Sequence, residues 1–549
     1  MLEIIISLSG GLGLFLFGMN TMSSGIENVA GARLRSIIER LAQNKFMGLI
    51  TGLIFTALIQ SSSASTVMAV SFVNSGLMTL SQASGIILGA NIGTTVTALI
   101  VAIKLSAVAP IFVFVGAVAY TFVKKNPMVQ KIGQVILGFG ILFVGISIMS
   151  DAMGSLKSVP GVLNALSAMS NPIMALLLGL VITSVVQSSS VTVSILVVMG
   201  AEGLIDLHTS MFVVLGCNMG ACTSALLAAL QSNKDGKRTA LIHLLVNIIG
   251  AAIFFFLLLV AGDTVERIVT FFGAIGTTEG VMGRNIAWAH ILTRVVQVVV
   301  CYPLMNAIIK LTYIIVPGED KEPEENAFRL KFINTPTLPN PAVAIYLAVQ
   351  EMERMAHKAF GNLNLALECL VTGDTLDLSM VFETEKYVDF LDAKISDYLV
   401  KINQTPLPIR DANRISAYFH VVNDIERIGD HANDIGHMTE ELAAENISFT
   451  HEAGEELREM MKKVNRILEK SLIMFVTGDT HDMQEIKSLE DEIDEIEREL
   501  QTKHITRLNE GYDSAQVGIY FSDVASALER VGDHAINIAF ALVESKKIT

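Results

Sequence analysis

Two short polar segments of this chain have the composition of an ion-binding site. Gln60 is followed by three serines, and the same tetrapeptide begins at Gln187. Carboxamide and hydroxyl oxygens, together with backbone carbonyls freed from a helix, suit a hard cation such as Na⁺. Backbone N–H groups freed at a broken helix end suit an anion. Each segment could therefore hold a cation, an anion or both.

The two segments belong to an internal repeat. A Gly-x-Asn-x-Gly pattern begins at Gly89 and returns at Gly216, and a Gly-rich apolar hexapeptide at Gly13 resembles one at Gly140. These two pairs and the Gln-Ser-Ser-Ser pair share one offset of 127 residues. Three matches in register without a gap indicate a duplicated structural unit.

The elements that carry these motifs are apolar enough to lie in a membrane. Residues 46–103 and 158–201 contain no charged side chain, and a spanning helix needs only about 20 apolar residues. Polar clusters interrupt the segments 50–73 and 177–200, and lipid does not tolerate exposed polar backbone. We therefore expect broken or re-entrant helices there. Other predicted spans are 4–20, 84–103, 106–123, 132–149, 211–230, 239–261 and 292–316.

Charge divides the chain into two different halves. Residues 1–315 hold 16 Lys/Arg and 10 Asp/Glu, whereas residues 319–549 hold 23 and 44. The whole chain is 51% hydrophobic, which excludes one ordinary soluble domain and makes a lipid bilayer the expected surroundings of the first half. The acidic second half argues against nucleic acid as a partner. The four cysteines form no CxxC pair, so we expect neither a disulfide framework nor a zinc site.

The basic loops predict the orientation of the repeats. Loops 33–45, 124–131 and 234–238 are rich in Lys and Arg, and such loops stay in the cytoplasm. Their counterparts in the other repeat carry few charges, so equivalent loops should lie on opposite sides of the membrane. Inverted repeats with interrupted helices are typical of secondary transporters, which bind substrate near the midplane. Packing between helices is the alternative role for Ser-rich turns, and His243, His290 and Arg294 could line a pore or satisfy local partners.

The doubled Gln-Ser-Ser-Ser segments and the downstream Gly-x-Asn-x-Gly patterns resemble the sodium–phosphate cotransporter family, the type II family of animals and its bacterial relatives. The resemblance covers about residues 5–315. It implies that inorganic phosphate moves together with Na⁺. Ala64 and Val191 stand where some relatives have a fourth serine, which leaves the sodium stoichiometry open.

The resemblance also implies which residues form the site. The central phosphate and sodium site would consist of Gln60, Ser61, Ser62, Ser63, Gln187, Ser188, Ser189 and Ser190. Candidates in a second polar element are Asn91, Thr94, Thr95, Asn218 and Thr223. Further sodium oxygens could come from Ser65, Thr66 and Thr192.

A proline-rich segment, 317–340, predicts a linker to a helical second half. Val371–Thr375 returns unchanged as Val476–Thr480, and Glu-Arg-x-Gly-Asp-His occurs at Glu426 and again at Glu529. Two three-helix bundles follow as the expected architecture. Their predicted helices are 341–372, 378–403, 408–444, 451–477, 481–510 and 514–545.

The bundles repeat a Glu-x-x-x-Asp pair four times, and this spacing places both carboxylates on one helix face. The pairs are Glu385 and Asp389, Glu426 and Asp430, Glu490 and Asp494, and Glu529 and Asp533. Facing pairs could hold a divalent or iron-type metal such as Fe, Mn, Zn or Mg. The alternative is a solvated acidic face, neutralised in part by Arg427 and Arg530. The doubled Glu-Arg-x-Gly-Asp-His motif resembles the PhoU family, which implies metal binding and regulation of phosphate uptake.

These observations predict an all-α, multi-pass protein of the cytoplasmic membrane. We expect the first repeat at 1–130, the second repeat with the final spans at 131–316, the linker at 317–340 and a cytoplasmic PhoU-like domain at 341–549. The expected function is sodium-coupled phosphate transport by alternating access, and the alternatives are a membrane-anchored phosphate sensor or a phosphate exporter. A regulatory protein or a second copy of the chain could be a partner. No P-loop, GxSxG or HExxH motif indicates an enzyme.

Overall fold

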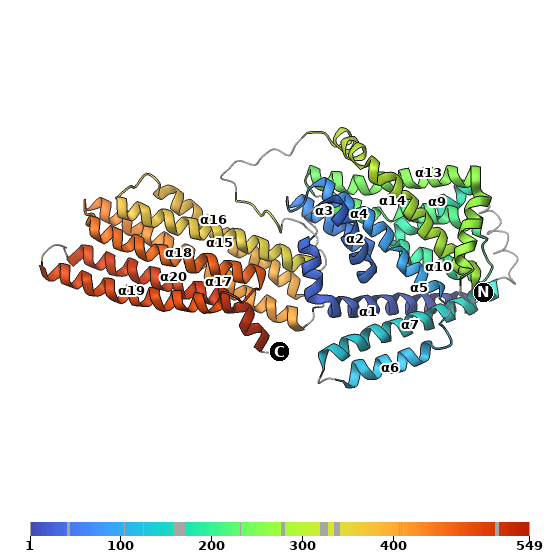
Figure 1. The fold of residues 1–549 in the computed structure, drawn as a ribbon, viewed down its shortest axis with the longest axis horizontal. Coiled ribbons are helices and arrows are strands. Elements are labelled where there is room, and N and C mark those ends of the chain that lie inside the picture. Colours follow the sequence, from blue (N-terminus) through green and yellow to red (C-terminus); the bar gives the residue numbers. More distant parts are fainter. Residues whose placement is uncertain are drawn as a thin grey trace. The chain divides into compact units, whose positions relative to one another are not determined.

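The structure is a computed structural model, and every regular element in the part of the chain that it describes is a helix. Described are residues 2–40, 44–103, 105–123, 126–156, 171–230, 232–275, 280–318, 328–333, 341–405, 407, 409–510 and 515–547. Described residues up to Gly318 form an N-terminal unit, and residues 328–333 join those from Pro341 onward in a C-terminal unit. The all-α prediction is confirmed (Figure 1). Of the predicted linker 317–340, residues 319–327 and 334–340 lie outside the described residues.

Helix bounds in the N-terminal unit follow the internal repeat. The helices of the first repeat are α1 (Leu2–Arg40), α2 (Lys45–Ile59), α3 (Ser62–Asn74), α4 (Leu80–Gly93), α5 (Thr95–Ala102) and α6 (Ala109–Phe122). Those that follow are α7 (Pro127–Leu156), α9 (Pro172–Val186), α10 (Ser189–Ala201), α11 (Leu207–Gly220), α12 (Thr223–Ala229), α13 (Lys234–Gly273) and α14 (Val281–Ile315). Both ends of α2, α3 and α4 recur in α9, α10 and α11 with the offset of 127 residues.

Among the described residues, six helical stretches are long and apolar enough to cross a membrane. They are Leu2–Ile26, Leu80–Ala102, Met128–Leu156, Leu207–Ala229, Lys234–Gly273 and Val281–Ile315. The predicted span 106–123 corresponds to α6, an apolar helix of only 14 residues. The interrupted segments 50–73 and 177–200 are the broken pairs α2–α3 and α9–α10, as the polar clusters predict. The inverted orientation of the repeats stays a prediction.

Glycines bring α4 against α2 and α11 against α9. A Cβ at Gly89 would lie 2.0 Å from the Leu49 carbonyl oxygen, and one at Gly216 would lie 1.9 Å from the Leu176 carbonyl oxygen. No side chain fits such a gap, so the backbones approach as closely as glycine allows. These contacts hold the Gly-x-Asn-x-Gly elements beside the helices that carry the Gln-Ser-Ser-Ser segments.

The last two helices of the unit bind both repeats together. α13 and α14 pack on each other, and between them they contact α3, α4 and α5 of the first repeat and α10, α11 and α12 of the second. By contrast, α1, α7 and α6 lie side by side as a separate group of helices (Figure 1). The α13–α14 pair therefore lies where a change in one repeat is felt by the other.

The C-terminal unit consists of the two predicted bundles. The first contains α15 (Pro341–Thr372), α16 (Leu378–Asn403) and α17 (Ile409–Ala444), and the second contains α18 (His451–Thr477), α19 (Met483–Glu510) and α20 (Ala515–Lys547). Each set of three packs mutually, and α17 packs on α20 between the bundles. Gly373 and Gly478 end α15 and α18 with a positive φ of 69° and 71°, which glycine adopts without strain.

A buried carboxylate fixes residues 328–333 to this unit. Glu351 of α15 is fully buried and accepts backbone N–H groups from Lys331, Phe332 and Ile333 at 3.0, 2.6 and 3.3 Å. Arg354 also donates to the other oxygen of Glu351, at 2.6 Å from its Nε. Part of the predicted linker is therefore a strap bound to the first bundle.

Candidate functional site

Both Gln-Ser-Ser-Ser segments break a helix in the same way. Gln60 ends α2 with φ 58° and ψ 24°, and Gln187 ends α9 with φ 57° and ψ 22°. A left-handed conformation is uncommon for a residue other than Gly or Asn, and it costs about 1–3 kcal/mol at a non-glycine residue. The pair recurs in both repeats, so the strain is a built feature of the breaks.

The serine after each glutamine starts the next helix. Ser61 and Ser188 are extended, and their hydroxyls accept the N–H groups of Ala64 at 3.2 Å and Val191 at 3.4 Å. This is N-capping, which leaves other first-turn N–H groups of α3 and α10 free for a ligand. The positive end of each helix dipole also lies at its break. Each break can therefore receive an anion at its N-terminal half and a cation at its exposed carbonyls.

The two breaks meet across the repeats. The Ser63 hydroxyl of the first repeat donates to the Gln187 carbonyl of the second at 3.4 Å. The Ser224 hydroxyl of α12 reaches the same carbonyl at 3.5 Å. On the other side, Thr97 of α5 donates to the Gln60 carboxamide oxygen at 2.7 Å. The first and last of these contacts place segments far apart in sequence within one polar region.

Two site residues emerge only from the structure. Thr97 and Ser224 were not predicted, although they are related by the repeat offset of 127 residues and both contact a break glutamine. The offset applied to every polar residue after the Gly-x-Asn-x-Gly patterns would have found them. Thr56 is a third, because its hydroxyl pairs with that of Ser65 at 2.6 Å.

The predicted residues of the second polar element lie in the interior. Asn91 and Asn218 are 1% and 4% exposed, and helix geometry turns each away from the close-packed glycines on either side of it. The hydroxyls of Thr94 and Thr95 donate to carbonyls of their own helix at 2.8 and 2.7 Å. Their oxygens keep lone pairs that can still bind a cation. Thr223 is half-buried at the start of α12.

Several of these side chains carry buried polar atoms without a hydrogen-bond partner. Within the described residues these include Nδ2 of Asn91, Oδ1 of Asn218 and Oγ of Ser189. Buried polar groups are rarely left unpaired, because each costs about 1–3 kcal/mol. Their concentration on predicted site residues is what a ligand-binding region shows without its ligand.

The remaining predicted residues differ in exposure. Ser65, Thr66, Ser190 and Thr192 are buried, Ser61, Ser62, Ser63 and Ser188 are half-buried, and Gln187 is exposed. The Thr66 hydroxyl donates to the carbonyls of Ser62 and Ser63 at 3.0 and 3.1 Å, and Thr192 donates to Ser188 at 3.2 Å. Whether these residues bind phosphate or Na⁺ stays a prediction.

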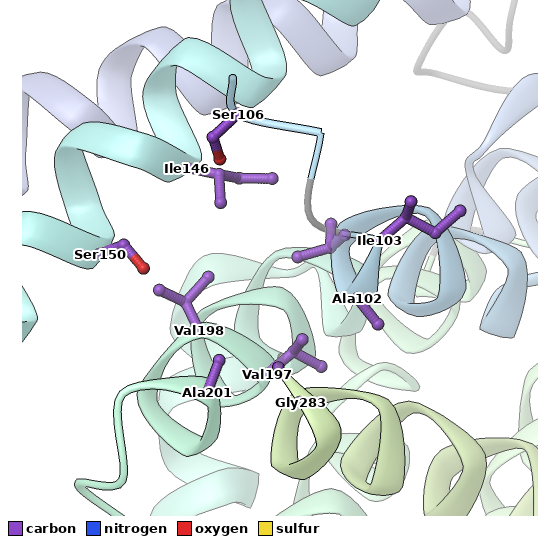
Figure 2. Close-up of a pocket in the computed structure, with 11 residues that line it drawn as sticks. Ala102, Ile103, Ser106, Ile146, Ser150, Val197, Val198, Ala201 and Gly283 are labelled. Carbon is purple, nitrogen blue, oxygen red and sulfur yellow. The ribbon is translucent and has the colours of Figure 1, made fainter. Parts of the chain in front are cut away.

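The two ends of the interface between the repeats differ. At one end, the backbone N–H of Asn233 donates to Oδ1 of Asn74 at 2.7 Å, and Nδ2 of Asn233 donates to the Asn74 carbonyl at 2.8 Å. The repeat offset relates these residues to Ser106 and Ala201. Those two residues line a cavity of about 40 Å³ instead, in which Ser106, Ile146 and Ser150 lie opposite Val198 and Ala201 (Figure 2). A cavity of this size holds a water molecule or two and no phosphate ion.

The predicted metal-binding carboxylates gather on both bundles. On the first bundle, Asp389, Asp430 and Glu426 all act on the charge of Glu385 and, after burial itself, raise its pKa to about 8. Glu385 is 7% exposed, and its Oε2 has no partner among the described residues. An orphaned carboxylate oxygen among three other carboxylates fits a cation. Arg427 neutralises part of this charge, since its Nη1 lies 3.0 Å from Oδ2 of Asp430.

The second bundle repeats the arrangement in a more open form. Burial, followed by Asp494 and then Asp533, raises the pKa of Glu529 and of its partner in a different order, and Glu490 responds to burial and Asp494. In the part of the chain that the structure describes, no three His, Cys, Asp or Glu side chains converge closely enough to hold a metal ion. Metal binding by Glu385, Asp389, Glu426, Asp430, Glu490, Asp494, Glu529 and Asp533 therefore stays a prediction.

Comparison with known proteins identifies both halves. The sequence model of the family described as Na⁺/Pi-cotransporter matches residues 14–151 and 158–283. A Bacillus subtilis relative, the uncharacterized protein YqeW, is 30% identical over 317 residues, which are 58% of this chain and 99% of that one. The chain belongs to the Na⁺/Pi-cotransporter family. A PhoU domain model matches residues 352–439 and 457–542, so both predicted resemblances are confirmed.

Two further relatives of this Na⁺/Pi-cotransporter family member have informative names. The putative inorganic phosphate export protein YjbB of Escherichia coli is 22% identical over 544 residues, 98% of this chain and 97% of that one. The sodium-dependent phosphate transport protein 2A of Rattus norvegicus is 42% identical over 97 residues, 17% of this chain and 15% of that one. The family is one of phosphate transporters with membrane helices, in agreement with the predicted transport function and with a protein that is not an enzyme.

Proposed function

We propose that this protein moves inorganic phosphate across the cytoplasmic membrane together with Na⁺, and that its C-terminal PhoU-like domain regulates this movement from the cytoplasm. The observation that carries the proposal is the meeting of the two breaks, where Ser63 of one repeat contacts Gln187 of the other. A site made by both repeats can be exposed on alternate sides when the repeats move relative to each other. The mechanism is therefore alternating access.

The chemistry of the breaks supports coupling to a cation. Free N–H groups at the starts of α3 and α10 favour phosphate, and the described part of each break contains no Lys or Arg. A bound divalent anion would then lack a neighbouring counter-charge in a low-dielectric interior. Hydroxyl, carboxamide and carbonyl oxygens beside it can bind Na⁺ and lower that cost. Sodium and phosphate thus stabilise each other in one site.

The test is uptake of radiolabelled phosphate into proteoliposomes. We expect accumulation with an inward Na⁺ gradient and none with an equal K⁺ gradient. Accumulation that is the same with both cations would contradict sodium coupling, whereas phosphate binding without accumulation would support a sensor. A vesicle preparation with an impaired mutant, such as Gln187→Ala, supplies the background.

Phosphate export is the second candidate, because the relative that covers 98% of this chain is named a putative phosphate export protein. Both directions use the same site, and reconstitution inserts the protein in both orientations. Expression in cells that lack their own phosphate transporters separates them. Import restores growth at low external phosphate, whereas export lowers the phosphate content of cells supplied with an organic phosphate source.

A further inference from the structure

The membrane unit contains one deeply buried guanidinium that the transport site does not use. Arg294 of α14 is 1% exposed and is among the largest fully buried side chains of the described residues. Its Nη1 donates to Oδ1 of Asn247 on α13 at 2.5 Å and to Oε1 of Gln297 at 3.0 Å. Its Nε has no partner. The charge is therefore solvated by two neutral carboxamides alone.

An anion is the missing element around this charge. None of the ion pairs found among the described residues involves Arg294, and the groups that act on it electrostatically are the thiols of Cys217 and Cys222 and the imidazoles of His243 and His290. Both ring nitrogens of His290 also lack partners. An uncompensated cation in a membrane interior is expensive, and such residues usually have a functional partner.

The position of Arg294 connects it to the second break. Cys217 belongs to the Gly-x-Asn-x-Gly element, and Cys222 directly precedes α12. Cys217 is also hydrogen-bonded to Thr183, whose carbonyl accepts the N–H of Gln187 at 2.7 Å. The guanidinium thus lies behind the polar element whose Asn218 has an unpartnered Oδ1. Its field acts on the region where the two repeats meet, without a contact to the bound ion.

We infer that Arg294 is the fixed positive charge that compensates bound phosphate and favours its divalent form. This inference rests on the proposed phosphate site and makes Arg294 a positioning residue for charge, with no direct contact to the substrate. A low-dielectric interior strengthens such an interaction relative to water. The otherwise unpaired charge then has a partner in the phosphate-bound state, and Na⁺ neutralises the remainder.

A purely structural role is the competing explanation. Arg294 could tie α14 to α13 through Asn247. Gln297 already does this, because its Nε2 donates to the Val246 carbonyl at 2.9 Å and to Oδ1 of Asn247 at 3.1 Å. A neutral side chain would complete such a tie at lower cost than a buried charge. The two explanations differ in what a change of charge does to phosphate affinity.

The experiment measures KM and kcat for phosphate uptake by Arg294→Lys, Arg294→Gln and Arg238→Gln. Arg238 is the matched control, since it is 2% exposed in the same unit but pairs with Asp235 and donates to the carbonyls of Val316 and Gly318. We expect R294Q to raise KM at least about tenfold and R294K to stay within about threefold of the wild type. R238Q should lower thermal stability and leave KM unchanged.

The pH dependence provides a readout that a structural role would not change. Between about pH 6 and about pH 8, phosphate changes from mainly monovalent to mainly divalent. The increase in KM caused by R294Q should therefore be larger at the higher pH. Asn247→Asp is a second variant that keeps the guanidinium and places a carboxylate beside it, so it should raise KM in the same way even where R294Q fails to fold.

Three results would overturn the inference: a wild-type KM for R294Q or N247D at both pH values, equal losses for R294K and R294Q, or an increase in KM that is independent of pH. Phosphate-dependent thermal stabilisation of the purified full-length chain separates this from a failure of the proposed function. A wild-type protein that neither binds nor transports phosphate contradicts the proposed function itself. A wild-type protein that does, beside an unaltered R294Q, contradicts only the role of Arg294.

Discussion

The two helix breaks share a backbone and differ in their surroundings. Gln60 and Gln187 have the same left-handed conformation, yet Gln60 is 7% exposed and bonded to Thr97, whereas Gln187 is exposed and offers only its carbonyl to Ser63 and Ser224.

The hydroxyls next to the breaks show the same difference. Thr56 is paired with Ser65 at 2.6 Å, whereas the corresponding hydroxyl of Thr183 has no partner among the described residues. Duplication therefore fixes the fold of each break, and packing decides which break is satisfied by protein. The second break is the one that retains most capacity for a ligand.

The largest expected effect is the loss of transport when either glutamine is removed. Gln60→Ala and Gln187→Ala should each abolish phosphate uptake, because both carboxamides belong to one site. Their effects on stability should differ: Q60A leaves the buried Thr97 hydroxyl unpaired and should cost about 1–3 kcal/mol, and Q187A should cost less than about 0.5 kcal/mol. Uptake into proteoliposomes and thermal unfolding in detergent measure the two quantities.

Gln82→Ala is the matched control for these substitutions. Gln82 forms a capping box with Thr79 at the start of α4, away from the breaks. Its removal should destabilise the protein by about 1 kcal/mol and preserve uptake. Normal uptake by both Q60A and Q187A would reject the shared site, and equal stability losses would reject the difference between the breaks.

Chemical access sharpens the same comparison. In a background without Cys217, Cys222, Cys301 and Cys369, which are buried, a cysteine at position 187 should react with a charged thiol reagent at least about tenfold faster than one at position 60. The reason is the exposure of Gln187 beside the burial of Gln60. Equal labelling rates would show that the two breaks are alike in the ion-free protein.

The sequence predicts the elements well because their ends are determined locally. The α3 and α10 starts follow from a serine N-cap after a polar break, and five of the six C-terminal helices begin or end within two residues of the predicted bounds because Gly373, Gly478 and proline interrupt them. The repeat offset carries the same information twice. Such signals do not depend on the rest of the fold.

The sequence could not predict how each site residue is surrounded. Identical tetrapeptides gave no reason to expect different burial of Gln60 and Gln187, because that depends on which helices pack against each break. Arg294 was recognised only as a polar residue in an apolar segment, since its partner Asn247 lies 47 residues away on another helix. Helical spacing correctly brought the acidic pairs together, but it does not determine side-chain conformations and so cannot decide whether they ligate a metal.

The two ends of the repeat interface predict a smaller effect. Asn74→Ala removes the acceptor of the Asn233 N–H, and a loss of about 1 kcal/mol changes an opening equilibrium about fivefold. A cysteine at position 225 reports this opening, because Ala225 belongs to the buried cluster with Val70, Ala229 and Ala240 at that end. We expect N74A to label about fivefold faster there.

Ala201→Asn is the reciprocal change, because Ala201 lines the small cavity with Ser106 where the other end has its asparagine pair (Figure 2). It should slow transport by stabilising closure at that end and leave labelling at position 225 unchanged. If N74A labels at the wild-type rate, the asparagine contact does not restrain the interface.

The smallest expected effect concerns the two acidic clusters and their dependence on pH. Burial and neighbouring carboxylates raise the pKa of Glu385 to about 8, whereas an unfolded Glu titrates near 4.3. Between these values the folded state binds more protons than the unfolded state, so the free energy of unfolding falls as pH rises through this window. Glu385→Gln in metal-free buffer should remove this slope and raise Tm by a few degrees at about pH 8. Glu490→Gln, in the half-buried second cluster, should change the slope less. Thermal unfolding of the full-length chain from about pH 5 to about pH 8 decides this, and an unchanged slope in E385Q would mean that the carboxylates of α16 and α17 are already neutralised by Arg427.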